Sequence, residues 1–96
     1  MMSKPRPAEL EFLREWVRAF FGGRCVRCQE STRIVHEIQS RAERPADYWA
    51  VENMVCLCET CHDWAHSTPS SIVEPILHRC QQVAMAGRSL DGPLAE

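Results

Sequence analysis

The chain has 96 residues, of which 45% are hydrophobic and 25% are charged, and its formal net charge is −2. These values are typical of one small globular domain and exclude both a strongly basic nucleic-acid binder and a membrane-spanning chain, because no apolar run approaches the roughly 20 residues of a membrane span. A domain of this size buries a modest core and is often stabilised by a metal ion, by disulfides or by a partner.

The first predicted element is an amphipathic helix from Pro7 to Phe21, preceded by a loose tail at 1–6. Proline suits the first turn of a helix, and Gly22 and Gly23 are expected to end it. Its apolar residues recur at steps of three and four, so we expect them in the core. They are Leu10, Leu13, Trp16, Val17, Phe20 and Phe21.

Two short strands are predicted in the middle of the chain. Residues 32–38 are rich in β-branched side chains, which predicts the first strand, and residues 54–57 predict the second. The segment between them, 39–53, has no clean period and contains Pro45, so we expect a loop there.

Two further helices are predicted towards the C-terminus. The first runs from about Glu59 to Ser67 and stops before Pro69. The second runs over residues 70–86, with Pro75 tolerated near its start and a flexible tail expected at 87–96. Its predicted apolar face consists of Ile72, Ile76, Leu77, Cys80 and Val83.

Six cysteines suit either a secreted disulfide framework or a metal site. The charged N-terminus is not followed by an apolar signal core, so we expect the protein in the cytoplasm, without a membrane partner. In that reducing compartment paired cysteines indicate metal ligands in preference to disulfides.

The spacing of the cysteines predicts one structural zinc ion. Cys25 and Cys28 form one Cys-x-x-Cys pair, Cys58 and Cys61 form another, and 29 residues separate the two pairs. Two residues between thiols allow each pair to bind one side of a tetrahedral ion, and a site with four cysteines leaves no open position for chemistry. The alternative is a redox pair, but such motifs usually occur singly within a larger parallel-sheet unit.

Two cysteines are left over. Cys56 lies on the second predicted strand and Cys80 on the last helix, and we expect both to be buried free thiols. Cys56 is also considered as a further candidate ligand for the zinc.

Three histidines surround the cysteine pairs. His62 and His66 are four residues apart on a predicted helix and therefore share a face, and His36 ends the first predicted strand. Neutral imidazoles are good ligands for a divalent metal, so we predict a second metal site on these three residues.

The sequence resembles the HNH nucleases over residues 24–67. The motifs that carry the resemblance are Cys25-x-x-Cys28, Val35-His36-Glu37-Ile38, Asn53, Leu57-Cys58-x-x-Cys61-His62 and His66. The resemblance implies an α+β fold, a small zinc-stapled ββα-metal (HNH, or His-Me finger) domain with a hairpin and helix around one catalytic metal. Residues 1–96 then form one domain, with the N- and C-terminal helices flanking the core.

The resemblance also implies roles for individual residues. His36, His62 and His66 correspond to the ligands of a catalytic divalent cation, which we expect to be Mg²⁺, Mn²⁺, Ni²⁺ or Zn²⁺. Asn53 corresponds to the asparagine that tethers the loop holding the general base. Glu37 stands where the family has the histidine that serves as that base.

Glu37 is the departure from the family pattern. A carboxylate has a reference pKa of about 4.3 against about 6.5 for histidine, so it is a weaker base at neutral pH. Glu37 can serve as the base or as an extra ligand, or the site has lost catalysis and kept the fold. In an alternative alignment His36 is the base and Val35 takes the ligand position, which a valine cannot fill.

The function implied by the resemblance is metal-dependent hydrolysis of DNA phosphodiester bonds, with DNA as the expected partner. The competing hypotheses are a non-catalytic zinc module that binds nucleic acid or a protein, and an accessory subunit of a phage-type packaging or modification system. Residues 1–44 carry nine Lys/Arg against six Asp/Glu, giving +3, and residues 45–96 carry two against seven, giving −5. The basic half suits either a phosphate-facing patch, with Arg41 and Arg44 near the site, or an ordinary solvated surface.

Three aromatic residues are candidates for stacking or for a partner interface: Tyr48, Trp49 and Trp64. Core packing is the expected role of Trp64.

Overall fold

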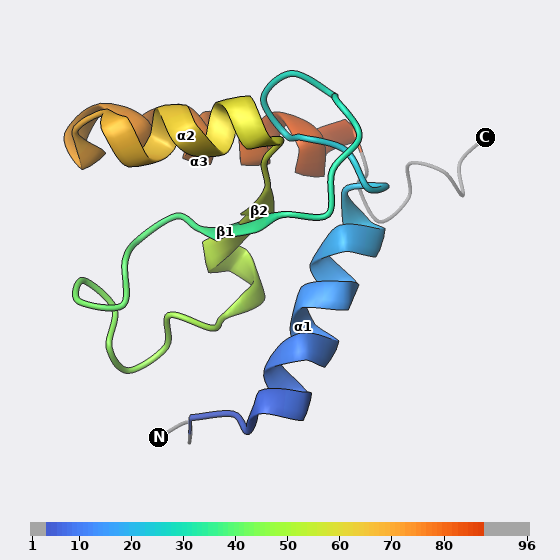
Figure 1. Ribbon diagram of the computed structural model, residues 1–96, viewed down its shortest axis with the longest axis vertical. Helices are drawn as coiled ribbons and strands as arrows, with labels where there is room; N and C mark the ends of the chain where they lie inside the picture. The colour runs from blue at the N-terminus through green and yellow to red at the C-terminus, as the bar shows by residue number, and fades with distance from the viewer. Residues whose placement is uncertain (1–3, 88–96) are drawn as a thin grey trace.

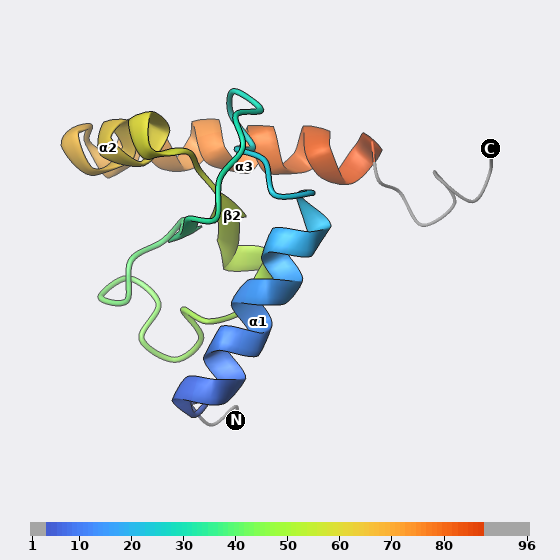
Figure 2. The ribbon, with the colours of Figure 1, turned by 45° about the vertical axis from the view of Figure 1, so that its right-hand side comes forward.

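The computed structural model describes residues 4–87, and its fold in that range is a small α+β domain. The elements in chain order are α1 (Pro7–Phe20), β1 (Val35–Glu37), a 3₁₀ turn η1 (Val51–Asn53), β2 (Met54–Cys56), α2 (Glu59–Ser67) and α3 (Ser70–Gly87). This confirms the predicted α+β class, with one helix before the strands and two after them. In Figures 1 and 2, α2 and α3 lie together above the strands while α1 runs below them.

The two strands form an antiparallel pair that places His36 opposite Val55. The first strand is shorter than the predicted 32–38, because Thr32 makes side-chain hydrogen bonds that take the place of the ladder. Its hydroxyl donates to the Leu57 carbonyl at 2.9 Å and accepts from the Ile34 N–H at 3.1 Å. A threonine that satisfies neighbouring backbone groups in this way ends regular pairing locally.

Helix α1 forms where the sequence predicts it. Gly22 and Gly23 follow it with φ angles of 66° and 68°, a left-handed conformation that glycine adopts without strain. Val17 and Phe21 are buried against the strands, but Trp16 is 49% exposed, so its predicted place in the core is wrong. The apolar pattern of α1 is wider than the stripe that the strands cover.

Helix α3 packs through a face that matches the predicted one only in part: Leu77 is buried as predicted, and Cys80 packs against the core while partly exposed. Val73, Leu77 and Gln81 are buried, whereas Ile72 is 49% and Val83 64% exposed. Gln81 is buried because its side-chain amide donates to the Glu52 carbonyl at 2.9 Å, so a polar residue occupies a core position. The predicted tail at 87–96 lies outside the described residues, apart from Gly87, which ends the helix.

The predicted loop between the strands covers part of the core. Tyr48 and Trp49 are each 5% exposed and pack edge to face, with ring centroids 4.9 Å apart. The sequence had suggested both as candidates for stacking or for a partner interface, and their burial shows that this suggestion is wrong. Trp64 is half-buried and packs against the core from α2.

Replacing Leu77 by alanine tests whether α3 is part of the cooperative core. Leu77 is fully buried, so the variant is expected to lose about 3 kcal/mol of unfolding free energy, from lost burial and the remaining cavity. Urea denaturation followed by circular dichroism measures the change. Ile76→Ala, on the more exposed face of the same helix, is the control and should cost well under half as much. Equal losses would contradict this packing of α3.

Candidate metal centres

The structure brings the four predicted zinc ligands together. The thiols of Cys25, Cys28, Cys58 and Cys61 all lie within 4.8 Å of one another. The first pair lies in the turn after α1, and the second pair links β2 to the first turn of α2. Four close cysteines in this arrangement can hold a metal ion such as zinc.

The spacing of the sulfurs fits a tetrahedral ion. Two sulfurs bound to zinc at about 2.3 Å lie about 3.8 Å apart, and the Sγ atoms of Cys28 and Cys58 lie 3.5 Å apart. All six cysteines are free thiols in the structure. The cluster therefore has the donor atoms and the size of a Cys₄ zinc site.

Backbone N–H groups already support thiolates at this cluster. Cys58 caps the start of α2, where its Sγ accepts from the Cys61 N–H at 3.5 Å, and the Sγ of Cys25 accepts from the Arg27 N–H at 3.4 Å. Burial raises the pKa of the Cys25 thiol, but the backbone N–H groups around it outweigh burial and lower that pKa to about 7. The thiolate is the form that binds metal.

Arg27 adds a positive charge next to the sulfurs. Its Nη1 lies 3.6 Å from the Cys61 Sγ, and its guanidinium stacks 3.8 Å from the centre of the Trp64 ring. A zinc ion with four thiolates carries a net charge of −2, which a neighbouring guanidinium partly offsets. Trp64 thus holds Arg27 beside the cluster while packing against the core.

The two remaining cysteines lie outside the cluster. Cys56 is fully buried on β2, and burial raises the pKa of its thiol to about 11, so it stays a neutral thiol at physiological pH. Cys80 on α3 is partly buried.

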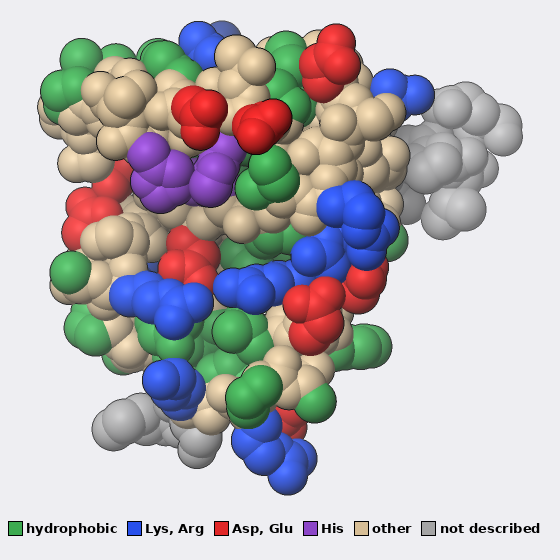
Figure 3. Space-filling model, viewed as in Figure 1, with side chains coloured by type: hydrophobic (Ala, Val, Ile, Leu, Met, Phe, Trp, Pro, Cys, Tyr) green, Lys and Arg blue, Asp and Glu red, His purple; other side chains and the backbone are tan. Residues whose placement is uncertain are grey.

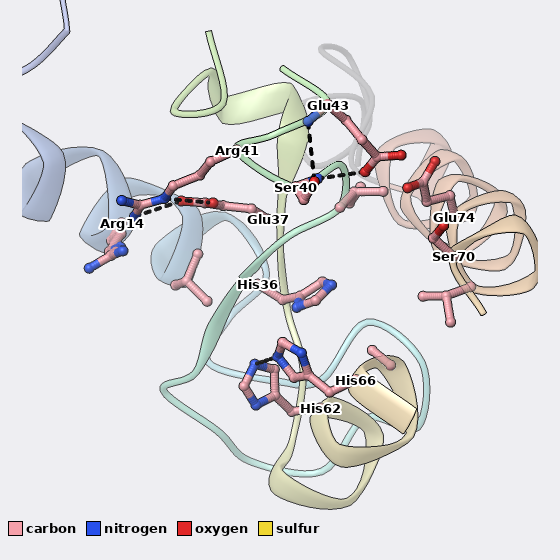
Figure 4. Close-up of a pocket in the computed structure, with 14 residues that line it drawn as sticks. Arg14, His36, Glu37, Ser40, Arg41, Glu43, His62, His66, Ser70 and Glu74 are labelled. Atoms are coloured by element: carbon pink, nitrogen blue, oxygen red, sulfur yellow. Dashed lines mark hydrogen bonds and ion pairs between the residues drawn. The ribbon is translucent and has the colours of Figure 1, made fainter. Parts of the chain in front are cut away.

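A second cluster joins the three predicted histidines. His36 from β1 and both His62 and His66 from α2 offer ring nitrogens that lie within 4.8 Å of one another. The Nε2 atoms of His62 and His66 are 3.0 Å apart, close to the ~3.4 Å between two nitrogens on one tetrahedral zinc ion. Figure 4 shows the three rings facing one another across the space between β1 and α2.

His36 is held in the form that binds metals. Burial, together with the positive charges that His62 and His66 would carry, lowers the pKa of His36 to about 4. Burial also lowers the pKa of His62. A histidine that is neutral at pH 7 has a free lone pair for a cation, so the donor chemistry of this cluster fits a divalent metal.

Glu37 does not join the histidines. It is the next residue along β1, and Figure 4 shows its side chain directed away from the three rings. Both of its carboxylate oxygens accept hydrogen bonds from Arg41, each at 3.2 Å. The side chain of Glu37 is 17% exposed, so this ion pair is partly shielded from water.

Asn53 is fully buried and fixes the start of the loop that follows β1. Its side-chain oxygen accepts from the Gln39 N–H at 2.9 Å, while its amide nitrogen donates to the carbonyls of Gln39 and Tyr48 at 3.1 and 3.0 Å. The Asn53 backbone carbonyl also accepts from the Ile38 N–H at 2.8 Å. One side chain thus holds both ends of the segment 39–48 beside the histidine cluster.

The histidines lie in a cavity of about 450 Å³ between β1, α1, α2 and α3. From the flanking helices, two charged groups that were not predicted as site residues also line it: Arg14 from α1 and Glu74 from α3. Burial, and then the hydrogen bond with the Glu43 carboxyl, raise the pKa of Glu74. Nothing in their local sequence distinguishes these residues, because they reach the cavity only through the packing of the flanking helices.

Comparison with models of known protein families, with curated proteins and with solved structures gave no match for this chain. None of the described helices is both long enough and apolar enough to cross a membrane.

Proposed function

We propose that this protein is a metal-dependent endonuclease of the HNH type that hydrolyses phosphodiester bonds in DNA and carries a structural zinc ion on its four cysteines. The observation that carries the proposal is the meeting of His36, His62 and His66 between a β-hairpin and a helix. Several neutral imidazoles that meet at one point with an open approach are a suitable ligand set for a hydrolytic metal. The cavity in front of the histidines supplies that approach.

In this proposal the histidines hold the cation and the surrounding residues place the substrate. A divalent cation bound there would polarise the phosphodiester and stabilise the charge on the leaving 3′ oxygen. Asn53 keeps the segment after β1 in position, so that His36 and Glu37 stay at the cavity wall. The neighbouring zinc cluster fixes the first turn of α2, the helix from which His62 and His66 project.

Glu37 has two assignments within this proposal. By its position after His36 it is the expected acceptor of a proton from the attacking water. By its hydrogen bonds it positions Arg41, since both oxygens are bound to that guanidinium. Glu37→Gln separates the two roles: a fall of about 100-fold or more in cleavage rate at unchanged DNA affinity supports the base, while weakened DNA binding at an unchanged cleavage rate supports the positioning role.

Cleavage of supercoiled plasmid by the zinc-loaded protein tests the function. With added Mg²⁺, Mn²⁺ or Ni²⁺ we expect nicked or linear product, and His36→Ala and His66→Ala are each expected to lower the rate by about 100-fold or more, because each removes a proposed ligand. His78→Ala removes a histidine of α3 outside the cluster and is the matched control. Cleavage that survives both cluster variants, or none from folded wild-type protein with any metal, would contradict the proposal.

A non-catalytic zinc module is the second candidate function, and the ion pair of Glu37 with Arg41 favours it because it leaves the family's base position engaged. Such a module would bind DNA or a protein, for instance as an accessory subunit of a phage-type system. Native mass spectrometry distinguishes the two: the nuclease is expected to bind a second divalent ion that His66→Ala removes, whereas the module holds zinc only at the cysteines.

A further inference from the structure

Arg14 is an arginine that lines the histidine cavity, where the Glu11 carboxylate acts on it only at longer range. It projects from α1, outside the segment that carries the histidines, and it is half-buried. Within residues 4–87 it forms no hydrogen bond or ion pair. The two acids beside it on the helix are engaged elsewhere, because Glu11 binds Arg18 at 2.8 Å and Glu15 binds Arg33 at 2.9 Å.

Arg41 lies at the same end of the cavity. Its guanidinium is bound by Glu37 and stacks over the Tyr48 ring at 4.4 Å, so two contacts fix its orientation. Figure 4 shows the Arg14 and Arg41 side chains at one end of the cavity, with the histidines at the other side of β1. Glu37 binds Arg41 directly, whereas no carboxylate of residues 4–87 forms an ion pair with Arg14, so this end of the cavity keeps a guanidinium with open N–H donors.

The remaining charges near the cavity make its two ends differ in electrostatic potential. Glu43 and Glu74 lie at the end near α3, where they would repel a phosphate. Arg44, the other arginine of the loop, is bound in a two-point pair by Asp47 at 2.7 and 2.9 Å. In Figure 3 a row of Lys and Arg side chains crosses the face below the histidines. A polyanion in the cavity is therefore attracted towards α1 and away from α3.

We propose that Arg14 and Arg41 together bind a backbone phosphate of DNA at the α1 end of the cavity, adjacent to the phosphate that lies at the histidine cluster. The planar guanidinium offers paired N–H donors that match phosphate oxygens. A phosphate between the two arginines relieves the repulsion of like charges and pairs the guanidinium that has open N–H donors. The inference rests on the proposed function, which supplies DNA as the ligand.

Fluorescence anisotropy with a short fluorescein-labelled DNA duplex tests the inference. The titrations use zinc-loaded protein carrying His66→Ala, without added divalent cation, at several salt concentrations, so that no cleavage occurs. Arg14→Ala is expected to weaken binding about tenfold and to lower the magnitude of the salt slope by about one. Arg14→Lys keeps the charge and should keep the slope, with a smaller loss of affinity.

Arg79→Ala is the matched control, because it removes the same charge from an exposed position on α3. It should change the affinity by less than about twofold. The inference is overturned if Arg14→Ala and Arg79→Ala behave alike, or if the parent protein does not bind the duplex. Among the described residues Arg14 forms no hydrogen bond or ion pair, so its removal should leave the chain folded, and an unchanged melting temperature checks this.

The two proposals can fail separately. DNA binding that depends on Arg14, in a protein whose wild-type form never cleaves plasmid, would sustain the phosphate site and remove the nuclease. Metal-dependent cleavage by the wild type, with equal effects of Arg14→Ala and Arg79→Ala on DNA affinity, would sustain the nuclease and remove the phosphate site.

Discussion

Replacing Cys58 by serine is expected to unfold the domain at 37 °C. Cys58 contributes to the cysteine cluster and also caps α2, so the variant loses a metal ligand and a helix cap together. Binding of zinc to a Cys₄ site contributes about 10 kcal/mol or more of apparent free energy, comparable with the roughly 5–15 kcal/mol of total stability of a small domain. Circular dichroism and zinc content by plasma mass spectrometry measure the two losses.

Cys80→Ser is the control for this prediction, because Cys80 is also a free thiol but lies outside the cluster. It should retain one zinc ion per chain and melt within a few degrees of the wild type. A strong chelator should reproduce the effect of Cys58→Ser on the wild-type protein, and added zinc should reverse it. A cooperatively folded Cys58→Ser variant without zinc would show that the cluster does not stabilise the fold.

The helices and the cysteine cluster could be predicted because their sequence signals are local. Helix α1 is bounded by a proline at one end and two glycines at the other, and both act through their own backbone preferences. The cysteine pairs are equally local, since two residues between thiols set the reach of each pair. The structure adds that the pairs meet, with all four thiols within 4.8 Å of one another.

The buried face of α3 could be predicted only in part, with Leu77 but without Val73 and Gln81, because the choice between neighbouring faces depends on tertiary packing. Apolar side chains at Ile72 and Ile76 match the helical period as well as those at Val73 and Leu77 do. The second set is buried in the same hydrophobic core as the strand residues, and a glutamine completes that face through its bond to the η1 turn. Tyr48 and Trp49 were placed wrongly for the same reason, since a segment without a period gives no indication of burial.

The histidine cluster could be predicted partly from local spacing and partly depends on tertiary packing. Two of its members, His62 and His66, are neighbours by helical spacing alone, whereas His36 joins them through the pairing of β1 with β2. Arg14 lies a whole helix away in sequence and reaches the cavity only through the packing of α1. In this domain sequence spacing therefore predicts the clustered cysteines and histidines better than the charged residues that line the cavity.

Replacing Asn53 by alanine is expected to cost about 3–5 kcal/mol of unfolding free energy. The side chain is fully buried and makes three hydrogen bonds to backbone groups, so its loss leaves one N–H and two carbonyls without partners. Asn53→Asp has nearly the same shape and still accepts from the Gln39 N–H, but it sets an oxygen against the two carbonyls. We expect it to be destabilised almost as much, although it leaves no cavity.

Gln81→Ala is the comparison that isolates the network, since Gln81 is also buried but makes a single hydrogen bond to a backbone carbonyl. Its expected cost is about 1–2 kcal/mol, measured for all three variants by urea denaturation. Asn53 also holds the segment that leads away from His36 and Glu37, so the proposed binding of a divalent cation at the histidines should be lost in the Asn53 variants under conditions where they remain folded. If the Asn53 variants are as stable as Gln81→Ala, the segment 39–48 is held by its own contacts. If they also keep cation binding, Asn53 does not position the site.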